Sequence, residues 1–212
     1  MTNQPQTAMA DQELTRHPLG LPAGSVRAVL ALTITGLFWI LLLIPEDKNI
    51  PVPLFLYFCT AMVLLFFFAH GKSISHQEGR SPPWGLPRGT IRFVIIGGTI
   101  AVFGFYYYLH KELPLSKLVP QPAQLVQWPK LLIGFAIGLG SGYLIGRGPW
   151  RKSDAFQDIQ AWVSLIAMLG LAVEVIIILF INPNLKQEMK IDLSTWEAIL
   201  TGIVAWYFGA RT

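Results

Sequence analysis

The sequence predicts an all-α polytopic membrane protein with six transmembrane helices, arranged as three tandem helical hairpins related as parallel repeats, with both termini cytoplasmic. Composition is the first reason: 53% of the 212 residues are hydrophobic, only 13% are charged, and the mean hydropathy is +0.50. Soluble domains carry about a quarter charged residues. The other reasons are an internal repeat and an uneven distribution of basic residues, which are taken in turn below.

Six apolar segments are each about long enough to cross a bilayer, which requires roughly 20 residues in a helix. The fifteen prolines lie outside these segments or in a first turn, so continuous helices are expected. The connections between them are too short for a soluble catalytic domain. The expected spans are Val26–Ile44, Val52–Ala69, Gly89–Leu109, Trp128–Gly146, Ile159–Ile181 and Ser194–Ala210.

An internal repeat groups these spans into hairpins. Residues 20–27 read GLPAGSVR and residues 85–92 read GLPRGTIR, and each copy immediately precedes an apolar run. The third hairpin lacks the motif and has Ser153-Asp154 in its place. The predicted organisation is a polar segment (1–24), hairpin repeat 1 (25–70), a cytoplasmic loop (71–88), hairpin repeat 2 (89–146), a second loop (147–158) and hairpin repeat 3 (159–212).

The basic residues set the expected orientation. Ten Lys and Arg side chains fall on the side of the termini, and six fall on the other side. Because cytoplasmic segments carry the excess of positive charge, both termini are expected in the cytoplasm. We expect an integral protein of a bacterial cytoplasmic (plasma) membrane. The net charge of +4 favours attraction to anionic lipid headgroups, so no nucleic-acid partner is expected.

The repeated motif also has a local interpretation. Gly-Leu-Pro favours a turn, Gly24 and Gly89 permit an unusual backbone angle, and the hydroxyl residue that follows each glycine is expected to cap the helix. Arg27 and Arg92 then lie in the first turn, at the headgroup level. They serve either as topological anchors or as ligands of lipid phosphate or of a partner, and the sequence leaves both readings open.

Small residues predict a close helix–helix contact. The glycines of the fourth span recur every four residues, which places them on one side of the helix, where another backbone can approach. The third span has a narrower face of this kind and is the expected partner within the same hairpin. A groove facing another subunit or lining a pore is the alternative. The residues concerned are Gly134, Gly138, Gly142 and Gly146 in the fourth span and Gly97, Ala101 and Gly104 in the third.

Glu174 is the ionisable residue expected deepest in the membrane. A charge at that depth costs at least about 2.5–3.5 kcal/mol, so the carboxyl requires a partner or a bound proton. It is either a proton- or cation-handling group, an anchor for a partner subunit, or a protonated bridge between helices. The hydrogen-bond donors considered for it are the hydroxyls of Thr33, Thr35, Thr60, Thr99 and Thr201.

These features favour a non-catalytic membrane protein that anchors or assembles a complex, with other membrane subunits or a second copy as partner. No catalytic motif is present, no His, Cys, Asp or Glu spacing matches a metal site, and no cofactor is expected. The alternative is an oligomeric channel or a proton- or cation-coupled transporter that uses Glu174.

Overall fold

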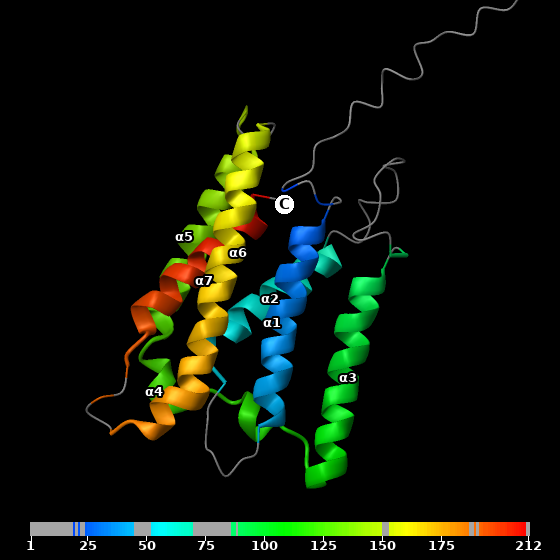
Figure 1. The fold of residues 1–212 in the computed structure, drawn as a ribbon, viewed down its shortest axis with the longest axis vertical. Helices are drawn as coiled ribbons and strands as arrows, with labels where there is room; N and C mark the ends of the chain where they lie inside the picture. The colour runs from blue at the N-terminus through cyan, green and yellow to red at the C-terminus, as the bar shows by residue number, and fades with distance from the viewer. Residues whose placement is uncertain are drawn as a thin grey trace, which may run out of the picture.

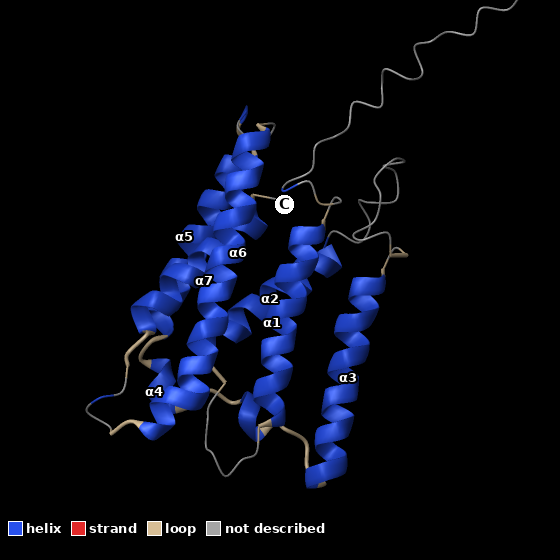
Figure 2. Ribbon diagram, viewed as in Figure 1, coloured by secondary structure: helices blue, strands red, loops and turns tan. Residues whose placement is uncertain are grey.

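A computed structural model describes residues 19, 21, 24–44, 52–69, 86–87, 89–149, 153–186, 189 and 191–210. Every regular element in these ranges is helical, and loops join the helices (Figure 2). The α-helices are α1 (Ser25–Leu43), α2 (Leu54–Ala69), α3 (Thr90–His110), α4 (Pro122–Leu125), α5 (Trp128–Gly146), α6 (Asp154–Ile176) and α7 (Ser194–Gly209). A 3₁₀ turn covers Ser116–Leu118, and α6 continues as a π-helix (Ile177–Ile181) and a 3₁₀ turn (Asn182–Asn184).

Four helical segments are long and apolar enough to cross a membrane: α1, α3, α5 and the 31-residue segment Asp154–Asn184. The prediction of an all-helical fold is confirmed within the described ranges, and these four segments are the ones suited to span a membrane. The expected second and sixth spans, α2 and α7, form helices of 16 residues each. Both are shorter than the roughly 20 residues that a perpendicular span requires.

The long helices alternate in direction (Figure 1). α1, α3 and α6 run one way, and α5 and α7 run the opposite way. α3 lies at one edge of the bundle and packs against α1, whereas α5, α6 and α7 form the other side. α2 lies obliquely behind α1 in this view and contacts α1, α5 and α7.

The short helix α2 supplies much of the core. Its side chains Phe55, Leu56 and Cys59 are fully buried, and Val63 is nearly so. A helix that is apolar on all sides suits such an interior position. α3 is the opposite case, since most of its large apolar side chains are exposed and Phe93 is 79% accessible. The bundle is therefore built around α2, with α3 at its edge.

The two copies of the repeated motif start their helices in the same way. Gly24 has φ 85° and Gly89 has φ 91°, which is the left-handed region that glycine adopts without strain, and each glycine is the N-cap of its helix. The expectation of side-chain caps is wrong. The Ser25 hydroxyl has no hydrogen-bond partner in the described part of the chain, and the Thr90 hydroxyl instead donates to the Pro87 carbonyl at 2.7 Å. The backbone conformation of the glycine, rather than a capping hydroxyl, defines both helix starts.

Candidate functional site

The glycines of α5 lie against α7. Gly134, Gly138, Gly142 and Gly146 face, in that order, Ala198, Gly202, Trp206 and Ala210. Both series rise along the chain, so the two helices run parallel (Figure 1). A Cβ placed on Gly134 would lie 2.5 Å from the Ala198 carbonyl oxygen, and one on Gly146 would lie 2.7 Å from the Ala210 carbonyl oxygen. Only glycine permits this approach of two backbones.

The expected partner of these glycines, α3, is not the helix that contacts them. A Cβ on Gly97 or on Gly104 would meet no atom of the described residues within 4 Å, and Ala101 is exposed. α3 instead packs on α1 through the neighbouring side of the helix, where Gly98 faces the Trp39 ring and the Trp39 indole N–H donates to the Thr99 hydroxyl at 3.1 Å. α7 takes the place expected for α3. Three of its four facing residues are small (Ala198, Gly202 and Ala210), and at the fourth position the Trp206 backbone makes the contact.

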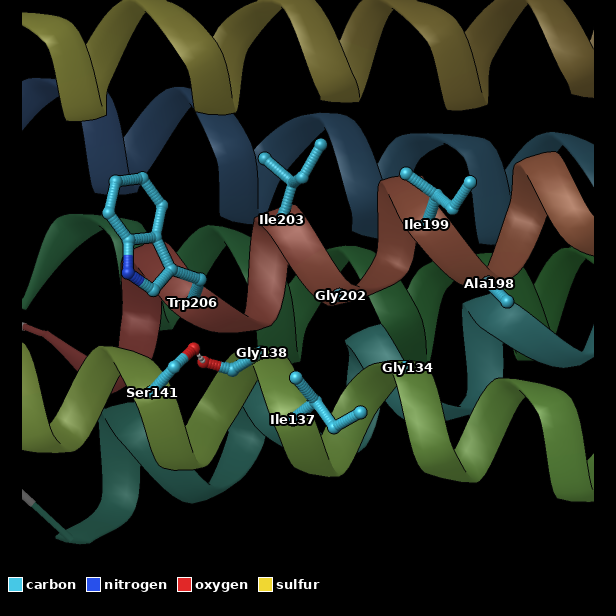
Figure 3. A pocket seen from close by; sticks show the side chains of 9 residues that line it. All are labelled: Gly134, Ile137, Gly138, Ser141, Ala198, Ile199, Gly202, Ile203 and Trp206. Atoms are coloured by element: carbon cyan, nitrogen blue, oxygen red, sulfur yellow. Dashed lines mark hydrogen bonds between the residues drawn. The ribbon is translucent and has the colours of Figure 1, made fainter.

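A shallow apolar groove of about 310 Å³ follows the outer side of the α5–α7 contact (Figure 3). The Ser141 hydroxyl donates to the Gly138 carbonyl of its own helix at 3.1 Å, so its hydrogen is already engaged. The remaining lining is backbone and hydrocarbon except for the Trp206 indole. The lining residues are Gly134, Ile137, Gly138, Ser141, Ala198, Ile199, Gly202, Ile203 and Trp206.

Glu174 lies inside the bundle, on the side of α6 that faces α7. It is 1% exposed, and its Oε2 has no hydrogen-bond partner in the described part of the chain. One turn earlier, a Cβ on Gly170 would lie 2.7 Å from a methyl group of Leu200, which shows that this face of α6 packs on α7. The α-helix ends two residues after Glu174, where the π-helix begins.

A second buried carboxyl, Glu197, was not expected from the sequence. It lies in the first turn of α7 and is 5% exposed. One of its oxygens accepts a hydrogen bond of 3.0 Å from the Phe55 backbone N–H, in the first turn of α2. The sequence pattern singles out Glu174 alone, and the structure adds Glu197 as a second buried carboxyl. Glu197 lies near the start of the sixth predicted span, a position at which the sequence gives no direct sign of burial. The one available signal was Thr201, one helical turn later, which was already among the polar neighbours considered for Glu174.

Of the five threonines considered as donors to Glu174, two donate elsewhere and two have buried hydroxyls without a partner among the described residues. Thr35 and Thr99 each donate to a carbonyl of their own helix at 2.7 Å. The buried hydroxyls of Thr60 and Thr201 have no hydrogen-bond partner in the described part of the chain. The fifth, Thr33, is half-buried on α1. Unsatisfied hydroxyls on α2 and α7 therefore accompany the two carboxyls in the interior.

The arginines of the repeated motif occupy the same end of the bundle. Arg27 lies in the first turn of α1 with its guanidinium over the Phe66 ring, 5.1 Å from the centroid. Arg92 lies in the first turn of α3 and is half-buried. Arg147, at the end of α5, covers the Tyr143 ring at 4.2 Å. These positions leave both readings of Arg27 and Arg92 open, and lipid binding stays a prediction.

Within the described ranges, three or more His, Cys, Asp or Glu side chains nowhere gather in a way that would hold a metal ion. Comparison of the chain with protein-family models, with curated proteins and with solved structures finds no match. The class of the molecule therefore follows from its own residues: within the described ranges it is all-helical, with four helices suited to cross a membrane and two buried carboxyls.

Proposed function

We propose that this is a non-catalytic integral membrane protein that anchors or assembles a membrane complex through α3. The observation that carries the proposal is the uncovered small-residue face of α3, formed by Gly97, Ala101 and Gly104. Lipid tails are as apolar as helix side chains, so helices associate in membranes through close backbone contact, which small residues permit. α5 already has α7 on its glycines, whereas the small face of α3 is available to a helix of another subunit or a second copy.

The proposed arrangement is three tandem hairpins with both termini in the cytoplasm of a bacterium. The alternating helix directions support it (Figure 1). The charge distribution among the described residues also supports this arrangement, because Arg27, Arg92 and Arg147 lie at one end of the long helices. Lysines lie at the opposite end: Lys111, Lys117, Lys130 and Lys186. An arginine-rich end suits the cytoplasmic, anionic face of the membrane.

Native mass spectrometry of protein purified from its own membrane in mild detergent tests the assembly role. We expect stoichiometric foreign subunits or a defined homo-oligomer. In the double variant Gly97→Leu/Gly104→Leu, which blocks the small face of α3 without touching the rest of the bundle, the partner should be lost. Gly140→Leu is the matched control, since Gly140 on α5 also has open space around it. A wild-type protein that is only monomeric would contradict the proposal.

The alternative function, an oligomeric channel or a proton- or cation-coupled transporter, is favoured by one observation, the buried and unpartnered carboxyl oxygen of Glu174. Intramembrane carboxyls are typical of ion pathways. Ion flux into liposomes that contain the wild-type protein or Glu174→Gln tests it. Flux that the substitution abolishes would replace the assembly role as the primary function, and absence of flux would remove the alternative.

A further inference from the structure

We propose that Glu174 and Glu197 together form one proton-binding site inside the bundle, with a single exchangeable proton on Glu174 and a negative charge on Glu197. The site joins α6 to α7 and α2. The inference is independent of the assembly role, because it concerns the interior of the bundle and not the outer face of α3.

Burial and proximity are the first step. Both carboxyls are at least 95% buried. α6 and α7 pack together and run in opposite directions, and Gly170, one turn before Glu174, faces Leu200 of α7. One turn further along α6 corresponds to one turn earlier on α7, so Glu174 lies beside the first turn of α7, which carries Glu197. In a low-dielectric interior, two neighbouring carboxylates repel each other strongly, and the pair is stable when one of them binds a proton. Paired carboxyls in other proteins share one proton for the same reason.

The surroundings decide which carboxyl holds the proton. Glu197 accepts a hydrogen bond from the Phe55 N–H at 3.0 Å, in the first turn of α2, where the partial positive charge of the helix stabilises an anion. Glu174 has no comparable donor at its buried Oε2 within the described ranges. An uncompensated charge there is costly, so the neutral acid is the favoured form of Glu174.

Among the described residues, the other ionisable groups on the helices around the pair do not neutralise it. Cys59 of α2 and Asp192, just before α7, are acidic groups and add no positive charge. Lys130, in the first turn of α5, is exposed. α1 contributes Arg27 alone among ionisable residues, in its first turn at the far end of the helix. Neither these groups nor the rest of α6, whose other acidic residues lie near its start, supplies a cation to the pair.

A buried hydroxyl next to the pair is the second structural observation. Thr201 lies one helical turn after Glu197, on the same face of α7. Its side chain is fully buried, and its Oγ1 has no hydrogen-bond partner in the described part of the chain. Such a group is costly unless it is hydrogen-bonded. A hydroxyl can both accept and donate, so Thr201 provides a neighbouring position for the proton as it enters or leaves.

Labelling with dicyclohexylcarbodiimide tests the site, because this apolar reagent adds to protonated carboxyls that lie within membranes. Full-length protein in liposomes is treated over a range of pH, and the modified residue is mapped by peptide mass spectrometry. We expect the label on Glu174, and we expect labelling to fall as pH rises. In Glu197→Gln the repulsion is gone, so the pH at which labelling of Glu174 is half lost should fall by about one unit or more. Glu112→Gln, an exposed substitution after α3, should leave that pH unchanged.

Labelling of Glu197 in preference to Glu174, no labelling of either carboxyl at any pH, or the same pH dependence in Glu197→Gln as in wild type would each overturn the proposal. Infrared spectroscopy of the wild-type protein provides a test that needs no variant to fold. The carbonyl stretch of one protonated carboxyl should be present at neutral pH and lost at high pH. Absence of that band at neutral pH would also overturn the proposal. Neither readout depends on whether partner subunits are found.

Discussion

At the scale of single residues, Lys117 connects three helices at one end of the bundle. Its ammonium donates to the Leu42 carbonyl at 3.1 Å and to the Ile44 carbonyl, which are carbonyls at the end of α1. The same ammonium lies over the buried Tyr106 ring, 5.0 Å from its centroid. The Tyr57 hydroxyl of α2 donates to the Lys117 backbone carbonyl at 3.1 Å. A cation at this position satisfies carbonyls that have no partner within the helix and complements the helix dipole.

We therefore expect Lys117→Met to destabilise the protein. Loss of a charge-assisted hydrogen bond to helix-terminal carbonyls costs about 1.5–3 kcal/mol, whereas the methionine retains most of the apolar contact. Thermal unfolding in detergent measures the change. Lys111→Met is the control, because Lys111 is exposed and lies over the exposed Tyr108 ring. Equal stability of the two variants would show that the contacts of the Lys117 ammonium contribute little.

Asp192 predicts a pH dependence at the start of α7. The Ser194 backbone N–H donates to its carboxylate at 2.9 Å, and this bond, with a second from the Ser194 side chain, lowers the pKa of Asp192 below its ordinary value. A lowered pKa gives stability that is present above the unfolded-state value, about 3.9, and is lost as pH falls through the folded value. Because Asp192 is exposed, the effect should stay below about 1 kcal/mol.

Amide exchange of Ser194 measures this effect. Protection of the amide should fall in wild type as pH is lowered below about 4, after correction for the intrinsic exchange rate. In Asp192→Asn the protection should be weaker at neutral pH and should change little over that range. A wild-type amide that keeps its protection in acid would contradict the assigned role of the carboxylate.

At the scale of secondary-structure elements, the contact between α5 and α7 depends on the absence of side chains. We expect Gly138→Ala to destabilise the protein by about 1–3 kcal/mol, because the new methyl group would overlap the Gly202 carbonyl of α7 and the two backbones would have to separate. Gly140→Ala is the matched control on the same helix. Gly140 has open space around it, so alanine there should be neutral or stabilising by up to about 1 kcal/mol.

Thermal unfolding of both variants in the same detergent measures the difference in stability between them. If Gly138→Ala proved as stable as Gly140→Ala, α5 and α7 would not pack backbone to backbone at this position.

Helix boundaries show where prediction from the sequence succeeds. The fourth span was predicted as Trp128–Gly146 and has those bounds as α5, and the first and third agree with α1 and α3 within one residue at each end. α6 begins at Asp154, five residues before the predicted start at Ile159. The polar residues of its first turns suggested a loop. They form the first turns of the helix instead, and the Asp158 carboxylate accepts a 2.8 Å hydrogen bond from the Leu19 N–H.

At the scale of the whole molecule, the proposed orientation predicts which side of the membrane each loop faces. In a Cys59→Ser background, the single cysteine of Ser153→Cys reports the end where α6 begins, and that of Glu112→Cys reports the end where α3 stops. A membrane-impermeant maleimide should label Glu112→Cys in intact cells, and Ser153→Cys only after permeabilisation. Both positions are exposed. Labelling of both from one side would contradict the alternating directions, and the reversed pattern would place the termini outside.

Composition and local sequence pattern are enough to predict the four long apolar helices and the glycine-defined starts of α1 and α3. These properties depend on local composition and on the backbone preferences of a few adjacent residues. Three features depend on contacts between distant segments: α7, rather than α3, covers the glycines of α5, the short helix α2 lies in the core, and Glu197 is buried on α7 near Glu174 of α6. Burial and pairing depend on contacts between segments up to about 140 residues apart, as in the hydrogen bond from the Phe55 N–H to Glu197. The pattern of neighbouring residues in the sequence does not predict such contacts.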